Sequence, residues 1–319
     1  MLKHALAVLF SMACSHGAYA AEPFPVKPVR FIVPFVPGGG TDTFARIVGA
    51  KLSEFWGQQV IVDNRGGAQG NIGTALAARA APDGYTVALA FVGTHSINPH
   101  LYKQPGYDAL KDFAAISRGS GEPWVITVRL SMPAKDIKEL IALAKKSPGK
   151  LNFASGSSGS QLAGELFKLA AGLDIVHIPY KGTGPATIDL LAGNVDMTLS
   201  IPTSVLTHIN AGRLRALAVT GAARIESLPE VPHALEAGLA QMNVLSWYGA
   251  VAPAATPVRT LDRLNADFVR ALNSPDVRER MKAAGQMPSP STREEFRRQM
   301  QADYDLWGKV VKSANLKVE

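Results

Sequence analysis

The sequence predicts an α/β protein of two similar lobes joined by two crossover segments. A strand–loop–helix pattern occurs twice, over residues 29–92 and again over residues 151–201. In each copy the first loop is rich in glycine or serine. The segments 118–136 and 243–257 are suited to carry the chain to the second lobe and back. Strands that alternate with helices favour parallel sheets covered by helices.

The N-terminus has the pattern of a secretory signal peptide. Lys3 precedes an apolar run from Ala5 to Ala13, and Ala18-Tyr19-Ala20 forms an A-x-A cleavage pattern. We therefore expect residues 1–20 to be removed and the protein to be periplasmic. The apolar run is shorter than the roughly 20 residues that a membrane span needs. Lipid attachment at Cys14, the only cysteine, is the less favoured alternative.

Size and composition indicate a globular protein with two domains. The chain has 319 residues, of which 18% are charged and 47% apolar, and about 150 residues per domain is typical. The net charge of +7 is spread along the chain, without the dense basic block of a nucleic-acid-binding protein. A mildly basic protein is compatible with an anionic small ligand.

The first copy of the pattern begins with a short apolar strand at 29–35 and the glycines of "PGGGTD". In the helix predicted over 41–57, Phe44, Ile47, Val48 and Leu52 have helical spacing, Thr41 is the expected N-cap and Gly57 the stop. The copy is completed by a strand (59–64), a loop (66–70), a helix (71–81), a turn (82–85) and a strand (86–92).

The second copy repeats this order about a hundred residues later. Its elements are a strand (151–155), the loop "GSSGS", a helix (161–172), a strand (174–180), a loop (181–184), a helix (185–194) and a strand (195–201). The helices predicted near the C-terminus should pack on the first lobe. We therefore assign residues 21–121 and 249–319 to lobe 1 and residues 122–248 to lobe 2.

The glycine loop lies where a strand meets a helix, so its backbone amides can surround an anion. A phosphate is the less favoured ligand: no lysine follows Gly40 as in a P-loop, and "GGGTDT" lacks the third glycine of a dinucleotide site, although Asp63 resembles its acidic residue. A reaction intermediate is the second alternative, in a hydrolase or transferase that uses the Ser155–Ser160 loop. The chain has no G-x-S-x-G motif, and its histidines lack zinc-binding spacing. We expect no enzyme activity, no metal and no cofactor.

A carboxylate is the third and favoured anion. Helix starts from both lobes would present partial positive charge without a full cation. The hydroxyl groups of Thr41, Ser157, Ser158 and Ser160 could add hydrogen-bond donors. Such a site suits a ligand with a carboxylate at each end.

Several segments together carry a family resemblance. They are "KPVRFIVPFVPGGGTDTFAR", "VIVDNRGGAQGNIGTALAARAAPDGYT", "GSSGSQLAGELFKLAAGLDIVHIPYKGTGPA", "LLAGNVDM" and "APAATP". The chain resembles the Bug-family periplasmic receptors of tripartite tricarboxylate transporters over almost its whole length. The resemblance implies a type II periplasmic-binding-protein fold and capture of a small carboxylate between two lobes. It also implies delivery to a membrane transporter or a role in signalling. Gly38–Thr41 and Ser155–Ser160 would hold the carboxylate.

We predict ligand contacts from both loops and from nearby strand ends. The predicted ligand-binding residues are Phe35, Gly38, Gly39, Gly40, Thr41, Asp42, Thr94, Ser155, Ser157, Ser158, Gly159, Ser160, Tyr180 and Asp196. Three successive glycines cost backbone entropy, which favours a close approach to the ligand. Asp42 complements the helix dipole, and Phe35 covers the ligand or belongs to the core. Thr94 is expected to donate a hydrogen bond, and Asp196 is equally expected to be structural. The partners would be the ligand and a transporter or sensor protein, with the receptor itself a monomer.

Overall fold

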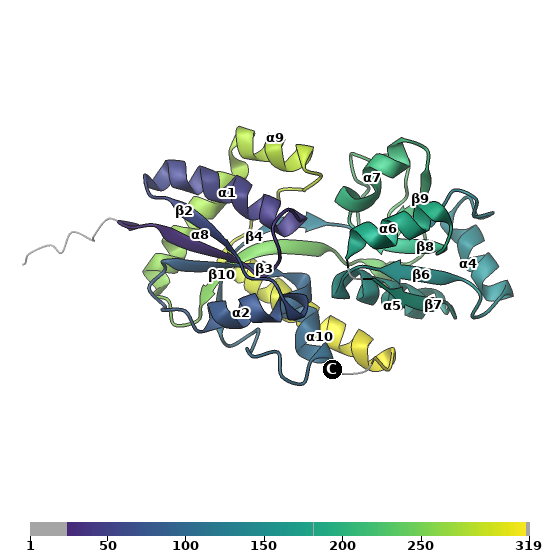
Figure 1. Ribbon diagram of the computed structural model, residues 1–319, viewed down its shortest axis with the longest axis horizontal. Helices are drawn as coiled ribbons and strands as arrows, with labels where there is room; N and C mark the ends of the chain where they lie inside the picture. Colours follow the sequence, from purple (N-terminus) through teal and green to yellow (C-terminus); the bar gives the residue numbers. More distant parts are fainter. Residues whose placement is uncertain (1–23, 181, 317–319) are drawn as a thin grey trace, which may run out of the picture.

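The protein consists of two α/β lobes, each built on a five-stranded sheet, as Figure 1 shows. The computed structural model describes residues 24–180 and 182–316. The predicted signal peptide, residues 1–20, lies outside the described residues. The α/β class and the two-lobed arrangement predicted from the sequence are confirmed. Among the described residues, no helix combines the length and apolar character that crossing a membrane requires.

The first sheet has the strand order β2-β1-β3-β10-β4. Its strands are β1 (Val29–Val33), β2 (Val60–Asn64), β3 (Thr86–Phe91), β4 (Phe113–Glu122) and β10 (Ser246–Pro253). β1 pairs in parallel with β2 and β3, whereas β10 is antiparallel to both β3 and β4. Its helical segments are α1 (Gly40–Trp56), η1 (Ala68–Gly70), α2 (Asn71–Ala78), η2 (Gly93–Ile97), α3 (Asn98–Leu101), α8 (Val258–Asn273), α9 (Pro275–Ala283) and α10 (Arg293–Ser313).

The second sheet repeats this design with the strand order β7-β6-β8-β5-β9. Its strands are β5 (Val125–Arg129), β6 (Asn152–Ser155), β7 (Val176–Pro179), β8 (Met197–Ser200) and β9 (Leu214–Val219). β6 is parallel to β7 and β8, and β5 is antiparallel to β8 and β9. Its helical segments are α4 (Ile137–Lys146), α5 (Ser158–Ala171), α6 (Thr183–Ala192), α7 (Pro202–Asn210) and η3 (Ala240–Met242).

In each sheet the antiparallel strand at the fourth position follows a crossing from the other lobe. β5 follows β4 through residues 123–124, and β10 follows β9 through residues 220–245. Glu122 and residues 246–248, which the sequence analysis assigned to lobe 2, pair within the first sheet. The reason is that β4 and β10 extend together to the crossing and bond to each other along their whole length.

Helix α1 shows how local sequence builds the first lobe. Phe44, Ile47, Val48 and Leu52 are all buried, as their helical spacing predicts. Gly57 ends the helix in the left-handed conformation (φ 60°), which glycine adopts without a steric penalty. Thr41 is not the N-cap, because the helix already begins at Gly40: Gly39 is the N-cap, and its carbonyl accepts a hydrogen bond from Thr43 N–H at 3.0 Å.

The C-terminal helices cover the first lobe, as predicted. α8 packs on β4 and α1, and α10 packs on β4 and η2. The ring of Phe268 on α8 meets Phe31 of β1 edge-on, with 5.9 Å between centroids. α10 also reaches the second lobe, where it contacts α5, and Figure 1 shows it running from behind the first sheet to below α5.

Candidate functional site

A cavity of about 280 Å³ lies between the two lobes. Its lining comes from the first lobe, from the crossing and from the second lobe. The lining residues are Phe35, Val36, Gly39, Gly40, Thr41, Phe91, Ser246 and Tyr248 from the first sheet and its loops, Trp124 at the crossing, and Gly156, Ser157, Ser160, Gly182, Thr183, Ser200, Ile201, Thr203 and Ser204 from the second lobe. We call this cavity the cleft.

Four helices begin at the cleft: α1 from the first lobe, and α5, α6 and α7 from the second. The first turn of an α-helix carries N–H groups without intrahelical acceptors, and the helix dipole places partial positive charge there. The Thr183, Gly184 and Thr203 amides at the starts of α6 and α7 have no acceptor among the described residues. The four starts together therefore form an environment that favours an anion.

The start of α1 offers the largest set of free donors. Its N-cap, Gly39, has no side chain that could accept a hydrogen bond. The N–H groups of Gly40, Thr41 and Asp42 have no acceptor in residues 24–180 and 182–316. A Cβ atom at Gly39 would meet no atom within 4 Å, so the space in front of these amides is open.

Asp42 organises the glycine loop from inside. The side chain is buried, and Oδ2 accepts hydrogen bonds from Gly38 N–H at 2.9 Å and from Arg46 Nε at 3.0 Å. Burial alone would raise the pKa of Asp42, but the hydrogen bonds from Arg46 and Gly38 outweigh it and hold the pKa below its ordinary value. Gly38 adopts φ +92°, which glycine tolerates best. Asp42 and Gly38 therefore shape the loop, and neither lines the cleft.

The start of α5 is closed by its own serines. Ser160 Oγ accepts from the Gly156 and Ser157 amides, both at 3.1 Å, and Ser157 Oγ accepts from the Ser160 amide at 3.2 Å. This is a capping box. The Ser158 and Gly159 amides have no acceptor in the described part of the chain, so this helix start leaves two free donors.

Close backbone contact holds the starts of α5 and α6 side by side. A Cβ atom at Gly156 would lie 2.2 Å from both the Gly182 carbonyl carbon and the Thr183 nitrogen. Gly182 itself has φ +122°. Only glycine satisfies both positions, so these two residues bring two dipole ends to one wall of the cleft.

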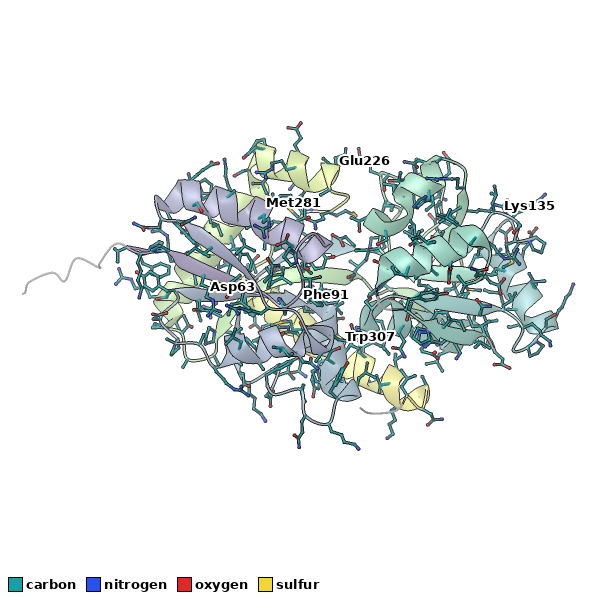
Figure 2. All side chains as sticks on the ribbon, viewed as in Figure 1. Asp63, Phe91, Lys135, Glu226, Met281 and Trp307 are labelled. Carbon is teal, nitrogen blue, oxygen red and sulfur yellow. The ribbon has the colours of Figure 1, made fainter. Side chains whose placement is uncertain are left out.

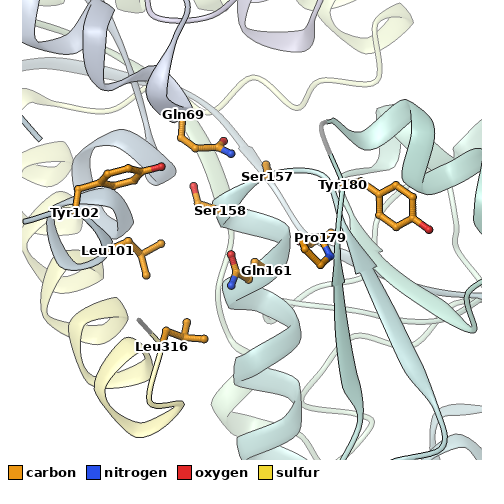
Figure 3. A pocket seen from close by; sticks show the side chains of 10 residues that line it. Gln69, Leu101, Tyr102, Ser157, Ser158, Gln161, Pro179, Tyr180 and Leu316 are labelled. Carbon is orange, nitrogen blue, oxygen red and sulfur yellow. The ribbon is translucent and has the colours of Figure 1, made fainter. Parts of the chain in front are cut away.

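A second cavity of about 240 Å³ flanks the other side of the α5 start. Figure 3 shows Gln69 and Tyr102 of the first lobe facing Ser158 and Gln161. Ser155 also lines this cavity, and its Oγ lies 2.6 Å from His177 Nε2. Burial lowers the pKa of His177 to about 4, assisted by the charge of Lys168, so the imidazole is neutral at physiological pH.

Tyr180 also lines this second cavity, but its hydroxyl group turns away from it (Figure 3). The hydroxyl donates to Asp189 Oδ2 at 2.6 Å. Tyr180 can therefore offer an arriving ligand its ring and not its hydroxyl group.

Thr94 and Asp196, like Gly38 and Asp42, line neither cavity. Thr94 is fully buried in the turn η2, where its hydroxyl donates to the Phe91 carbonyl at 3.1 Å and contacts His95 Nδ1 at 2.9 Å. Asp196 precedes β8 at its amino end, whereas the cleft lies at the carboxyl end. The Asp196 carboxylate accepts from Arg129 Nε at 3.1 Å and from Asn152 N–H at 3.0 Å. In this arrangement Asp196 binds the Arg129 side chain and the first residue of β6.

The other predicted residues, apart from Gly159, line one or both cavities. Phe35, Gly39, Gly40, Thr41, Ser157 and Ser160 line the cleft, and Ser155, Ser157 and Ser158 line the second cavity. Gly159 lines neither. A Cβ atom there would lie in van der Waals contact with the rings, 3.5 Å from Trp124 Cζ2 and 3.6 Å from Phe91 Cζ, so Gly159 faces these two rings.

Several cleft residues were not predicted from the sequence. They are Val36, Phe91, Trp124, Thr183, Ser200, Ile201, Thr203, Ser204, Ser246 and Tyr248. For Thr203 and Ser204 a signal existed, because "SIPTSV" follows a strand in the same way as the two loops that were recognised. For Trp124 and Tyr248 the relevant signal is the strand order, which local sequence does not reveal.

Behind the cleft, Glu122 is a buried acid. It pairs with Ser246 across β4 and β10, and neither carboxyl oxygen has a hydrogen-bond partner among the described residues. Burial raises the pKa of Glu122 to about 8, so the carboxyl is mostly protonated at neutral pH. Burial also raises the pKa of Tyr248 well above its usual range. Both groups therefore add little negative charge beside an anion.

The placement of the titratable residues bears on a metal site and on a nucleotide site. Among the described residues, no group of three or more His, Cys, Asp or Glu side chains is placed to hold a metal ion. Asp63, the mimic of a ribose-binding carboxylate, forms ion pairs with Arg30 and Arg65.

Comparison with known proteins identifies the family of the chain. A sequence profile described as "Tripartite tricarboxylate transporter family receptor" matches residues 44–316. The chain is 36% identical to Protein BugT of Bordetella pertussis, over 94% of this chain and 93% of that one.

Solved structures are similar over nearly the whole chain. "R. palustris Rpa4515 with adipate" has a TM-score of 0.82 at 33% identity, covering 92% of this chain and 99% of that one. "MatC (Rpa3494) from Rhodopseudomonas palustris with bound malate" has a TM-score of 0.79 at 31% identity, covering 90% and 100%. Because the matching family consists of receptors, the hydrolase or transferase alternative for the serine loop has no support. The chain belongs to the tripartite tricarboxylate transporter receptors, the Bug family of periplasmic solute-binding proteins.

Proposed function

We propose that this protein captures a small organic carboxylate, a di- or tricarboxylate or a similar anion, in the cleft between its lobes. The observation that carries the proposal is that four helix starts line one cavity, and three of them, α1, α6 and α7, have free amides on residues of its lining. Amides at a helix start bind a carboxylate through hydrogen bonds and through the dipole. Structural relatives that hold adipate and malate support the same ligand class.

Capture requires that the lobes close on the ligand about the two crossings at residues 123–124 and 220–245. Contacts between the lobes support this mode of binding. Lys282 Nζ on α9 lies 2.7 Å from Glu226 Oε1, and Figure 2 places Glu226 on the side of the second lobe that faces α9. Gly285 packs against Thr203, so closely that a Cβ atom would lie 2.8 Å from the threonine methyl group. A ligand with differential affinity for the closed arrangement would stabilise it.

Family membership implies a membrane transporter as the receiving partner. We further propose that residues 1–20 are removed on export, leaving Ala21 as the mature N-terminus, and that the receptor acts as a monomer. Signalling through a sensor protein is the second role within the same proposal. In either role the closed, liganded receptor is the form that the partner recognises.

Thermal unfolding with a panel of ligands tests the binding proposal. Malate, adipate, citrate and benzoate are the anionic probes, and the diamine putrescine is the cationic control. A ligand at a hundredfold excess over its Kd adds about 2.7 kcal/mol of apparent stability, so one or more carboxylates should raise Tm by several degrees. Putrescine should leave Tm unchanged. A Tm that responds to putrescine, or to none of the four carboxylates, would refute the proposal.

A further inference from the structure

One side of the cleft is a continuous wall of aromatic rings. Phe35 and Phe91 meet edge-on with 5.6 Å between centroids, and Phe91 lies 5.7 Å from Tyr248 at 43°. Trp124 lines the same cavity. Figure 2 shows Phe91 at the margin of the first lobe that faces the second. A small ligand in this cleft must therefore contact aromatic carbon.

This wall runs from the start of α1 to the start of α5. A Cβ atom at Gly40 of α1 would lie 3.7 Å from Tyr248 Cζ, and a Cβ atom at Gly159 of α5 would lie 3.5 Å from Trp124 Cζ2 and 3.6 Å from Phe91 Cζ. Trp124 is held in place by Trp307 of α10, edge-on at 5.9 Å. A carboxylate bound to the free amides of Gly40 and Thr41, which line the cleft, would thus place its attached carbon skeleton beside the rings.

The charge of the lining favours a single carboxylate. Among the described residues that line the cleft, none is Lys, Arg, His, Asp or Glu; Lys181, next to Gly182, lies outside the described residues. Each further ionised group buried without a cation costs several kcal/mol in solvation.

We propose that the ligand selected by this cleft is an aromatic monocarboxylate with a single ring. The proposal rests on the carboxylate-binding function proposed above and narrows it. The carboxylate bonds to helix-start amides, and the ring packs against Phe91 and Trp124. The hydroxyl groups of Ser200, Thr203 and Ser204 line the second-lobe side and suit a polar substituent on the ring. The volume of about 280 Å³ is at the small end for ligand pockets, in keeping with one ring.

Calorimetric titration with matched probes tests this proposal on the full mature protein. Benzoate and cyclohexanecarboxylate have the same charge and a similar size, and only benzoate is flat and aromatic. Edge-to-face and offset ring contacts should favour benzoate by about threefold to tenfold. Malate, adipate and citrate should bind more weakly than benzoate, and benzyl alcohol, which lacks the charge, should bind most weakly.

A pair of variants then locates the preference. Phe91→Leu keeps an apolar side chain but removes a ring from the wall, so the preference for benzoate over cyclohexanecarboxylate should fall to about one. Phe55→Leu is the matched control in the same lobe. Phe55 packs under the Arg270 guanidinium, 3.9 Å from its ring centroid, and does not line the cleft. Its replacement should leave the preference unchanged. Circular dichroism checks that both variants are folded.

Each contrary outcome identifies which proposal fails. Tighter binding of malate, adipate or citrate than of benzoate overturns the aromatic monocarboxylate and leaves the carboxylate receptor intact. Equal affinities for benzoate and cyclohexanecarboxylate, or a benzoate preference that survives in Phe91→Leu, also overturn it. Binding of benzyl alcohol as tight as that of benzoate, or no binding of any carboxylate, refutes both proposals.

Discussion

The glycine loop before α1 and the serine loop before α5 both line the cleft, but they differ in how the first amides of the helix are capped. At the start of α1, Gly39 provides no cap, and three amides, those of Gly40, Thr41 and Asp42, have no acceptor among the described residues. At the start of α5, Ser157 and Ser160 cap the helix reciprocally and leave two amides free. The first loop is shaped from behind by Asp42, the second by its own hydroxyl groups.

The difference indicates how binding energy divides between the lobes. An uncapped helix start gains most from an external anion, because the anion supplies the missing cap. A start that is already capped has less to gain. We infer that the ligand carboxylate binds mainly to α1 and that the second lobe contributes shape and additional donors. The affinity of each variant below is measured for the carboxylate of the panel that binds the parent protein most tightly.

The largest effect is expected from Gly39→Asp. Gly39 has φ −84° and ψ 174°, which is the backbone conformation of ordinary N-cap residues. The new carboxylate would cap α1 from within and occupy the amides that the ligand needs. Affinity measured by calorimetry should fall on the order of a hundredfold or more. Unliganded stability should rise by roughly 0.5 kcal/mol.

Gly39→Ala is the matched control, because it adds a Cβ atom into open space without a cap. It should lose much less affinity than Gly39→Asp. A side chain at Gly40 would be a poorer probe, since its Cβ atom would lie 2.9 Å from Tyr248 Oη and disturb packing as well. If Gly39→Asp binds as tightly as the parent protein, the α1 amides do not hold the carboxylate.

Asp42→Asn should have the next largest effect. It weakens the hydrogen bonds to Gly38 and Arg46, and unfolding by urea at neutral pH should show a loss of about 1–3 kcal/mol. Affinity should fall about fivefold, as for one weakened hydrogen bond, because the turn at Gly38 loosens. Asp267→Asn is the control: Asp267 is also buried and bound by an arginine four residues away, Arg263, but it lies on α8 outside the cleft. It should cost stability without changing affinity.

The pH dependence of this loss has a defined sign. The pKa of Asp42 is lowered in the folded protein from its ordinary value of 3.8. Its contribution is therefore complete above that value and is lost as the pH falls through the lower folded pKa. The stability difference between the parent and Asp42→Asn should be constant above about pH 5 and should narrow below pH 3.8. If the stability difference between the parent and Asp42→Asn grew on acidification, the ionised Asp42 carboxylate would not be what stabilises the loop.

The smallest effect on ligand affinity is expected from Ser160→Ala, in the serine loop before α5. Ser160→Ala removes the acceptor of the Gly156 and Ser157 amides and should cost about 1 kcal/mol of stability. Affinity should stay within about twofold of the parent, less than 0.5 kcal/mol. Glu295→Ala is the equivalent change in the capping box of α10 and should cost stability alone. A loss of affinity in Ser160→Ala as large as in Asp42→Asn would remove the proposed asymmetry between the lobes.

The repeated pattern of strands and helices was readable from the sequence because each element carries its own signal. The burial of Phe44, Ile47, Val48 and Leu52 follows from their spacing alone. The loops that precede α1 and α5 were readable for a similar reason. Small residues after a strand, followed by a helix, mark the carboxyl edge of a sheet, where ligands collect.

What the sequence could not reveal depends on strand order and side-chain direction. Trp124 and Tyr248 reach the cleft because β10 lies between β3 and β4, a pairing of distant segments. Thr94 does follow a strand at the correct edge, but the turn η2 points its hydroxyl at a backbone carbonyl. Asp196 could have been rejected in advance, since it precedes its strand and so lies at the opposite edge of the sheet.

The place of β10 in the first sheet also has a consequence for how the chain folds. β3 and β4 are successive in sequence but are not neighbours, because β10 bonds to both of them. The first lobe therefore keeps two open strand edges until residues 246–253 arrive, more than 120 residues after β4 ends. The second sheet draws all of its strands from the continuous stretch 125–219, so it can form without any later segment of the chain. Open edges are templates for pairing with other chains, so the first half of this protein, the first to emerge, is the part in greater need of protection during assembly.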